Sequence, residues 1–412
     1  MQRLVSARIL LLITDAGGGH RAAASSLVEW ARRAGKRWDL RIVNLYREML
    51  ADDEPIKHAL GFYGEDAYNV ILTRQIRRSL PLLQRVAAIT AHLPNKRARR
   101  AVAGFLERER PDLSVSLMPF VNDYCAVIHA DTGVPFGLVC TDLVDIEPRM
   151  WFTRRAMARS RFVCVGSPEA AVQAREAGAG DRVIETGLVV HPKFFDEETQ
   201  RLGRAEARRR LGLDPHAFTV AVLMGGYGGP SIRNIVRQLE AAENTCQVVA
   251  CCGHNDRLRS ELDALASASK NRVVPLGFTT EIPTIMRASD VLITKPGTTT
   301  LMEALALGVA IVLDDVNAMP QERPNAVWAE AQGVAIRLRR RREVLDVIGR
   351  LRSDPNLGRD MRRRQQERAG QPAGPRVLDV MEACLARGRR EPPPAAARGW
   401  RQASPRRQGP LD

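Results

Sequence analysis

The sequence predicts an α/β protein in which each of two halves contains a parallel sheet, and residues 289–315 show this most directly. Val291–Thr294 and Val309–Leu313 are short apolar runs, as expected for buried strands. The residues between them form a helical segment that Thr299 or Thr300 can cap and Gly308 can end. A strand–helix–strand unit implies parallel strands joined by a right-handed crossover.

The N-terminus supplies a second unit of the same kind. Arg8–Thr14 reads as a strand, three glycines (Gly17, Gly18 and Gly19) read as a tight turn, and an apolar stripe predicts a helix to about Arg33. His20 stands where this helix begins. It is either a group placed in a cleft for proton transfer or a helix-start histidine with no chemical role.

Length and charge limit the possible classes of protein. A chain of 412 residues with 45% hydrophobic residues predicts two or three domains. The net charge of +15 and the pI of about 10.2 favour an anionic partner, which is nucleic acid, a phosphate ligand or an acidic membrane surface. The alternative is an arginine-rich composition spread over solvated faces.

Cysteine spacing and apolar run length exclude several further classes. Seven cysteines without a C-x-x-C pair predict neither a zinc site nor a disulfide framework, and favour a reducing cytoplasm. The longest apolar run, residues 304–313, is far shorter than the roughly 18–20 residues of a membrane span. The apolar run at residues 9–13 is too short for a signal peptide.

The first half continues with more strands and a basic segment. Further strands are predicted at residues 40–44, 113–117, 136–140 and 162–165. Residues 74–110 hold ten Lys or Arg and two acids, interleaved with apolar residues. Helices of this kind either lie on anionic lipid or pack one face on the domain and solvate the other.

The second half opens with a glycine-rich loop after a strand. Strands are predicted at residues 218–224, 247–252 and 272–276. Gly225, Gly226 and Gly228 follow the first of them, and Pro230 then starts a helix. Free backbone N–H groups and the helix dipole suit a diphosphate there, although no Gly-Lys-Ser/Thr closes a Walker loop. Amphipathic helices follow to about Ala386, and residues 387–412 are a basic, proline-rich tail.

Two motifs resemble a known family. Thr-Lys-Pro-Gly-x-x-Thr-x-x-Glu-Ala at residues 294–304 and Pro-Gln-Glu-x-x-Asn at residues 320–325 resemble the donor site of GT-B glycosyltransferases. The resemblance is closest to monogalactosyldiacylglycerol synthases and bacterial diacylglycerol glucosyltransferases, and more distant to the peptidoglycan N-acetylglucosaminyltransferase. Residues 14–24, 141–142 and 186–194 resemble further motifs of the same family.

The resemblance implies a domain organisation. The fold is α/β of the GT-B type, with two Rossmann-like domains facing a cleft. Residues 1–190 form the acceptor domain, 191–203 a linker, 204–370 the nucleotide-sugar domain, 371–386 a C-terminal helix and 387–412 a disordered tail.

The resemblance also implies the reaction and its partners. A hexose passes from a UDP-sugar to a diacylglycerol-type lipid with inversion, at the cytoplasmic face of the plasma membrane, where the enzyme binds peripherally through the anionic surface. No cofactor, metal or specific nucleic acid is expected, and the absence of any Asp-x-Asp agrees with a metal-independent reaction.

The site residues follow from the motif matches. His20 is the expected base, and Asp142 orients or replaces it. The acceptor-side loop is Gly17, Gly18 and Gly19. The donor residues are expected to be Gly225, Gly226, Gly228, Phe278, Lys295, Gly297, Thr299, Thr300, Glu303, Gln321, Glu322 and Asn325. Glu303 suits the ribose hydroxyls, although Thr300-x-x-Glu303 also reads as a capping box.

One segment departs from the family, and two rival functions remain. Residues 147–153 lack both histidines that the family usually has after Thr-Asp. One rival is a GT-B enzyme whose acceptor is a polyprenyl-linked sugar or another glycoside. The other is a non-catalytic basic protein that binds membrane or nucleic acid and has no UDP site.

Overall fold

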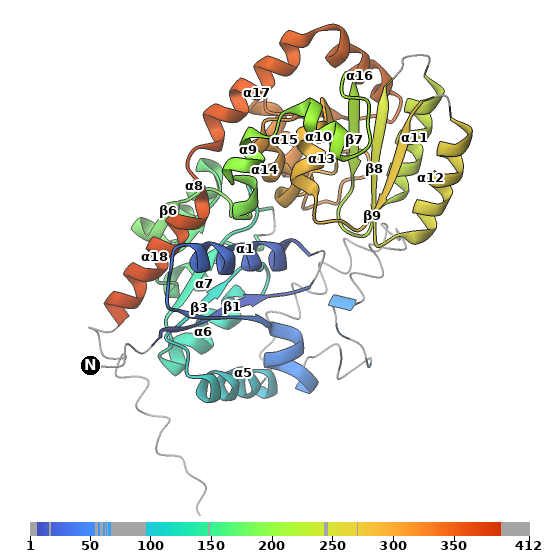
Figure 1. The fold of residues 1–412 in the computed structure, drawn as a ribbon. Helices are drawn as coiled ribbons and strands as arrows, with labels where there is room; N and C mark the ends of the chain where they lie inside the picture. Colours follow the sequence, from blue (N-terminus) through green and yellow to red (C-terminus); the bar gives the residue numbers. More distant parts are fainter. Residues whose placement is uncertain are drawn as a thin grey trace, which may run out of the picture.

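Two parallel six-stranded sheets, each covered by helices, organise the chain in the computed structural model (Figure 1). The structure describes residues 6–15, 18–53, 57, 61, 63, 65–66, 96–146, 149–242, 246–269 and 271–388. The α/β prediction is confirmed. Within these described ranges, no helix combines the length and the apolar character needed to cross a membrane.

The first sheet has the order β2-β1-β3-β4-β5-β6, and all its strands are parallel. Alternate residues of β1 pack into two separate cores, Leu10 with one and Ile9 with the other, as expected for a sheet covered on both faces. The strands are β1 (Arg8–Ile13), β2 (Asp39–Asn44), β3 (Leu113–Ser116), β4 (Phe136–Val139), β5 (Val163–Val165) and β6 (Val183–Glu185).

Helices and short helical turns connect these strands. They are α1 (Gly19–Arg33), η1 (Leu45–Leu50), η2 (Ala51–Asp53), α5 (Lys96–Glu109), α6 (Asn122–Thr132), α7 (Arg154–Arg159), α8 (Pro168–Glu176) and η4 (Gly180–Arg182). The predicted helix to about Arg33 is confirmed as α1. Of the predicted basic segment 74–110, only residues 96–110 lie within the described residues, and they contain α5.

The second sheet has the order β12-β11-β10-β7-β8-β9 and is again entirely parallel. Leu292 and Val291 of β10 point into two different cores, so this sheet is also buried on both faces. The strands are β7 (Thr219–Leu223), β8 (Gln247–Gly253), β9 (Val273–Gly277), β10 (Val291–Thr294), β11 (Ala310–Asp314) and β12 (Ile336–Leu338).

The second sheet is covered by helices, and a connecting segment joins it to the first domain. The helices are α11 (Pro230–Ala241), α12 (Asp256–Ala268), α13 (Ile282–Ala288), α14 (Thr298–Leu307), α15 (Arg323–Ala331), α16 (Glu343–Ser353) and α17 (Pro355–Ala369). The connection contains η5 (Pro192–Phe194), α9 (Glu197–Arg201) and α10 (Arg204–Arg210).

The ten predicted strands are confirmed, each with ends within one residue of the prediction. The sequence did not predict β6 or β12. Both have only three residues and contain a charged residue, Glu185 or Arg337, so neither shows an apolar run.

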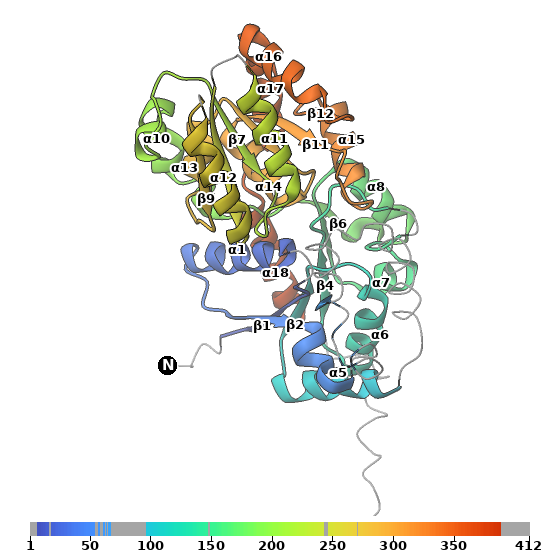
Figure 2. The ribbon, with the colours of Figure 1, turned by 90° about the vertical axis from the view of Figure 1, so that its right-hand side faces the viewer.

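The last helix, α18 (Ala373–Gly388), returns to the first domain and packs against α1 (Figures 1 and 2). The contact is close, because a Cβ at Gly374 would lie 2.1 Å from Cδ1 of Trp30. Trp30 also donates its indole N–H to the Val190 carbonyl at 2.9 Å. The chain therefore crosses between the domains twice, near residues 186–203 and near residues 369–373.

Candidate active site

Topology places one candidate site on each sheet. In parallel α/β sheets, ligands bind beyond the carboxyl ends of the strands where the strand order reverses. In the first sheet the reversal lies between β1 and β3, and in the second it lies between β7 and β10. The loops at these two points are the ones that carry most of the predicted site residues.

His20 lies in the first turn of α1, directly after the β1 loop. The N-cap residue is Gly18, which has a left-handed φ of 83° and no capping side chain. His20 is half-buried, and its Nδ1 lies 3.3 Å from Oγ1 of Thr141. Burial lowers the pKa of His20 to about 4, although the Leu117 carbonyl and the Asp15 charge act to raise it. The imidazole is therefore neutral at pH 7.

Asp142 follows β4 and is next in sequence to Thr141, the residue whose hydroxyl contacts His20. Its Oδ2 accepts a hydrogen bond from the indole N–H of Trp151 at 2.8 Å. Burial raises the pKa of Asp142 to about 6, and the charges of Asp145 and Glu322 also raise it, while the indole bond lowers it. The side chain that contacts His20 is Thr141, so the role of Asp142 in orienting His20 stays a prediction.

Asp145 organises the loop that carries Trp151, and sequence reasoning missed it. Its buried carboxylate accepts four backbone N–H bonds, each 3.0 Å long, from residues 146, 150, 151 and 152. Residues 146 and 150–152 are therefore held around this carboxylate, and the Trp151 ring centroid lies 6.2 Å from that of His20. Glu147, in the segment that departs from the family, lies outside the described residues, as does Gly17 of the acceptor-side loop.

A buried polar cluster supports the β1 loop from behind. Asp15 accepts two hydrogen bonds from Arg21 and one from the Asn44 amide. The hydrogen bond from Arg21 is the main cause that lowers the pKa of Asp15. Glu65, itself buried, accepts from the Asp15 backbone N–H and from the Asn44 amide. These bonds hold Asp15 in place at the end of β1.

In the second domain, the glycine loop follows β7 and leads into α11 at Pro230, as predicted, while diphosphate binding there stays a prediction. Gly225 and Gly228 have left-handed φ values of 83° and 55°. A Cβ at Gly228 would lie 2.2 Å from the carbonyl oxygen of Cys252, so only glycine fits there. Gly229 is the N-cap of α11 and offers no capping side chain, and Pro230 is the first helical residue.

Three aromatic rings lie together beyond β7, β8 and β9. Phe278, predicted to adjoin the donor base, is 61% exposed. Its ring stacks on His254 with centroids 4.2 Å apart and an interplanar angle of 14°. Tyr227 completes the group, with its centroid 6.0 Å from that of His254. His254 and Tyr227 are isolated residues on different loops, so no sequence motif indicates them.

The start of α14 differs from the prediction. Its N-cap is Gly297 and no side chain caps it, so the expected capping by Thr299 or Thr300 is wrong. The helix already begins at Thr298, so Thr300 and Glu303 are not placed to form a capping box. The first-turn N–H groups are therefore not used by a capping side chain, and such groups suit an anion. Gly308 ends the helix with a φ of 66°, as predicted.

Glu303 is half-buried on α14, and no hydrogen bond joins its carboxyl group to the described residues. Burial raises the pKa of Glu303 to about 8, although the positive charge of Lys193 acts to lower it. A protonated carboxyl group can both donate and accept a hydrogen bond, which suits a pair of ribose hydroxyls.

The segment after β11 carries the last of the predicted donor residues. Glu322 is buried and pairs with Lys295 Nζ at 2.5 Å, and its other oxygen accepts the Met319 N–H at 3.2 Å. Asn325 is also buried, and its amide donates to the Pro296 carbonyl at 3.2 Å. Asn325 therefore holds the Lys-Pro-Gly turn in place. Gln321 lies next to Met319, with Nε2 3.9 Å from its sulfur.

The two sides of the site face each other. The first turns of α1 and α14 are adjacent, since a Cβ at Gly19 would lie 3.4 Å from Oγ1 of Thr299. The charge of Glu322, in the second domain, also raises the pKa of Asp142, in the first. The predicted catalytic residues and the Lys295–Glu322 pair are therefore brought together, although they are at least 150 residues apart in sequence.

Comparison with known proteins shows which families this chain is similar to. Residues 219–369 match the glycosyltransferase family 28 C-terminal domain. Monogalactosyldiacylglycerol synthase of Spinacia oleracea is 28% identical over 83% of this chain and 65% of the relative. Processive diacylglycerol beta-glucosyltransferase of Bacillus subtilis strain 168 is 26% identical over 84% of this chain and 87% of the relative. The chain spans less than two thirds of the length of the spinach relative and of monogalactosyldiacylglycerol synthase 1 of Arabidopsis thaliana. The resemblance inferred from the motifs is confirmed.

Solved structures show the same fold at low sequence identity. The calicheamicin glycosyltransferase CalG4 superposes with a TM-score of 0.60 and 16% identity, over 93% of this chain and 99% of that protein. MurG of Acinetobacter baumannii gives a TM-score of 0.58 and 12% identity, over 92% and 99%. The predicted GT-B fold is confirmed.

Proposed function

We propose that this chain, whose residues 219–369 form a glycosyltransferase family 28 C-terminal domain, transfers a hexose from a UDP-sugar to a diacylglycerol-type lipid. The relatives named for diacylglycerol glycosylation match more than four fifths of the chain, which supports this substrate class. The anomeric carbon is inverted in a single displacement.

One observation carries the proposal. The first turn of α1, with His20, and the first turn of α14, without a capping side chain, meet across the domain boundary. One side offers a neutral base and the other offers N–H groups to an anion. This is the pair of functions that sugar transfer from a nucleotide diphosphate requires, because a hydroxyl must lose a proton while a phosphate leaves.

The displacement follows from this geometry. The acceptor hydroxyl attacks the anomeric carbon, its proton passes to His20, and the bond from that carbon to the UDP oxygen breaks. Positive charge develops on the sugar and on the imidazole in the transition state. Ionised Asp142 stabilises both charges, so both His20 and Asp142 must be unprotonated for full activity.

The second domain stabilises the leaving group. The N–H groups at the start of α14 and the glycine loop before α11 accept the diphosphate, and Lys295 turns from Glu322 toward it. Glu322 and Gln321 then face the sugar hydroxyls, while Glu303 bonds the ribose and Phe278 adjoins the base. Lys295 and the backbone N–H groups balance the negative charge of the diphosphate, and we propose that the reaction requires no metal.

The lipid acceptor implies contact with an anionic membrane. Helix α5 buries Ala98, Val102, Phe105 and Leu106, and its exposed side carries basic residues. We assign this side of the first domain to the membrane surface, at the inner face of the plasma membrane. This placement brings the acceptor to the domain that carries His20.

The direct test is transfer from labelled UDP-glucose and UDP-galactose to diacylglycerol in detergent micelles by the full chain. The expected product is a glycosyldiacylglycerol, identified by mass spectrometry, with an anomeric configuration opposite to that of the donor. A parallel reaction contains a polyprenyl-linked sugar instead. Transfer only to that acceptor would contradict the lipid assignment, and no binding of UDP at all would contradict a transferase.

A further inference from the structure

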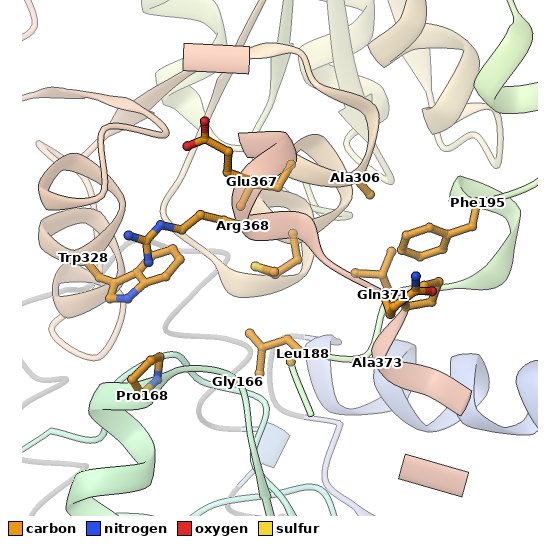
Figure 3. A pocket seen from close by; sticks show the side chains of 15 residues that line it. Gly166, Pro168, Leu188, Phe195, Ala306, Trp328, Glu367, Arg368, Gln371 and Ala373 are labelled. Carbon is orange, nitrogen blue, oxygen red and sulfur yellow. The ribbon is translucent and has the colours of Figure 1, made fainter. Parts of the chain in front are cut away.

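A cavity lies where the two domains join, against the later part of α14. Its volume is about 410 Å³, within the range of roughly 300–1,000 Å³ typical of small-molecule sites. We call it the hinge cavity. Its walls come from the loop after β5, the start of α8, the connection after β6, α14, α15 and the α17–α18 connection (Figure 3).

The hinge cavity is separate from the candidate active site. On α14 it is lined by Met302, Leu305 and Ala306, in the later part of the helix. Lys295 and Thr299, which precede or begin the helix on the donor side, do not line it. A molecule in the hinge cavity would therefore contact α14 without occupying the proposed nucleotide site at the start of that helix.

Apolar side chains form most of the wall. Leu188 and Phe195 come from the interdomain connection, and Trp328 comes from α15. The Trp328 ring is fixed, because its indole N–H donates to the Glu169 carboxylate of α8 at 3.2 Å. A fixed apolar wall of this kind suits the hydrocarbon body of a ligand.

Two charged residues line the cavity, Glu367 and Arg368 of α17. Arg368 lines it from the end of α17, and Figure 3 shows its guanidinium extended toward Trp328. Among the described residues, Arg368 has no carboxylate within ion-pair distance. The neighbouring Glu367 carboxylate points away from Trp328 and Leu188 in the same view. Apolar walls with one free guanidinium favour an organic anion.

We infer that the hinge cavity binds an organic anion with an apolar body, of the fatty-carboxylate type. The hydrocarbon lies against Leu188, Phe195 and Trp328, and the carboxylate pairs with Arg368. Because the walls belong to both domains, the bound molecule stabilises this relative arrangement of the domains. This is the arrangement in which α1 and α14 meet. The next step rests on the proposed function, in which UDP binds at the start of α14: a ligand in the hinge cavity then strengthens UDP binding.

The experiment titrates the full chain calorimetrically with dodecanoate and, as a matched ligand, with dodecyltrimethylammonium, which has the same chain length and the opposite charge. Dodecanoate is expected to bind with one-to-one stoichiometry and the cation at least tenfold more weakly. Arg368→Gln removes a charged hydrogen bond and should weaken dodecanoate roughly tenfold or more. Ala306→Phe fills the cavity and should abolish binding. Arg363→Gln is the control, since Arg363 is exposed on the same helix and outside the cavity.

Specific results would overturn the inference. Equal binding of the two ligands, or unchanged dodecanoate affinity in Arg368→Gln, would show that the cavity does not select an anion. Displacement of dodecanoate by saturating UDP would place it in the donor cleft instead. UDP affinity should rise several-fold with dodecanoate present, and an unchanged value would refute the coupling. If UDP binds in neither condition while dodecanoate binds, the proposed function fails and the hinge-cavity site stands.

Discussion

Trp151→Phe should shift the acid limb of the pH–rate profile, because it removes the indole N–H that bonds Asp142 at 2.8 Å. The phenyl ring keeps most of the packing. A hydrogen bond to a charged group contributes roughly 1.5–3 kcal/mol, and one pKa unit corresponds to about 1.4 kcal/mol. The pKa of Asp142, about 6 with the bond in place, should therefore rise by roughly one to two units.

The direction in which activity changes with pH follows from which protonation state of Asp142 is active. Ionised Asp142 supports transfer, so activity falls as pH drops through its pKa. His20 also must be unprotonated, but its pKa of about 4 lies lower, so Asp142 sets the limb. With a shifted pKa of about 7.5, kcat/KM at pH 6.5 should fall roughly eightfold, while kcat/KM at pH 9 stays close to that of the parent.

The assay measures kcat/KM for sugar transfer between pH 5 and pH 9. Trp38→Phe is the matched control, because Trp38 is partly buried and lies outside the candidate active site. Asp142→Asn should remove the limb near pH 6 and lower the plateau. A limb that stays in place in Trp151→Phe, with equal loss at every pH, would refute the assignment of this limb to Asp142.

Four further outcomes follow from the structure. His20→Ala should lower transfer by about 10²–10⁴ with UDP affinity unchanged, and near-normal turnover would exclude it as the base. Glu303→Ala should weaken UDP binding by roughly 1.5–3 kcal/mol in calorimetry, whereas Glu303→Gln, which mimics the protonated form, should retain it. UDP should bind equally with magnesium or with EDTA. A chain ending at Gly388 should still sediment with anionic vesicles at low salt through α5, and loss of binding would move that contact to the tail.

Stability should also depend on pH through a buried group outside the site. Burial lowers the pKa of His129 to about 4, below the usual 6.5, so the unfolded chain binds the proton more readily. The contribution of neutral His129 to the free energy of unfolding is complete above pH 6.5. It is lost as pH falls toward 4, by about 3 kcal/mol in total. In urea unfolding, the free energy of unfolding should differ less between pH 7 and pH 4.5 in His129→Asn than in the parent chain. An equal difference in the two proteins would contradict this role of His129.

Local apolar runs made most of the fold predictable. Strands such as β1 and β10 are buried on both faces, so nearly every residue in them is apolar and their ends are marked by glycine, proline or a polar residue. β6 and β12 could not be found this way. Each is three residues long and pairs with a neighbour on one side only, so tertiary pairing rather than local pattern makes them strands.

The candidate site was predictable where a backbone conformation requires a particular residue. Gly228 is needed because any Cβ would clash with Cys252, and Gly308 is needed for a left-handed helix end. Asp145 has no such local signature. Its four N–H donors come from residues one, five, six and seven positions later, and only the folded loop brings them to one carboxylate.

The same limitation applies to the return of the chain after the second sheet. The segment 373–388 reads as one more amphipathic helix, and nothing local shows that it packs on the first domain. Gly374 reveals the contact only once Trp30 is seen against it. Because α18 is anchored on the first domain and α17 on the second, the residues between them must absorb any rotation of the domains. Gln371 lies in this short connection, between Arg368 of α17 and Ala373 of α18, and all three residues line the hinge cavity. A ligand there therefore contacts the part of the chain that absorbs a rotation of the domains.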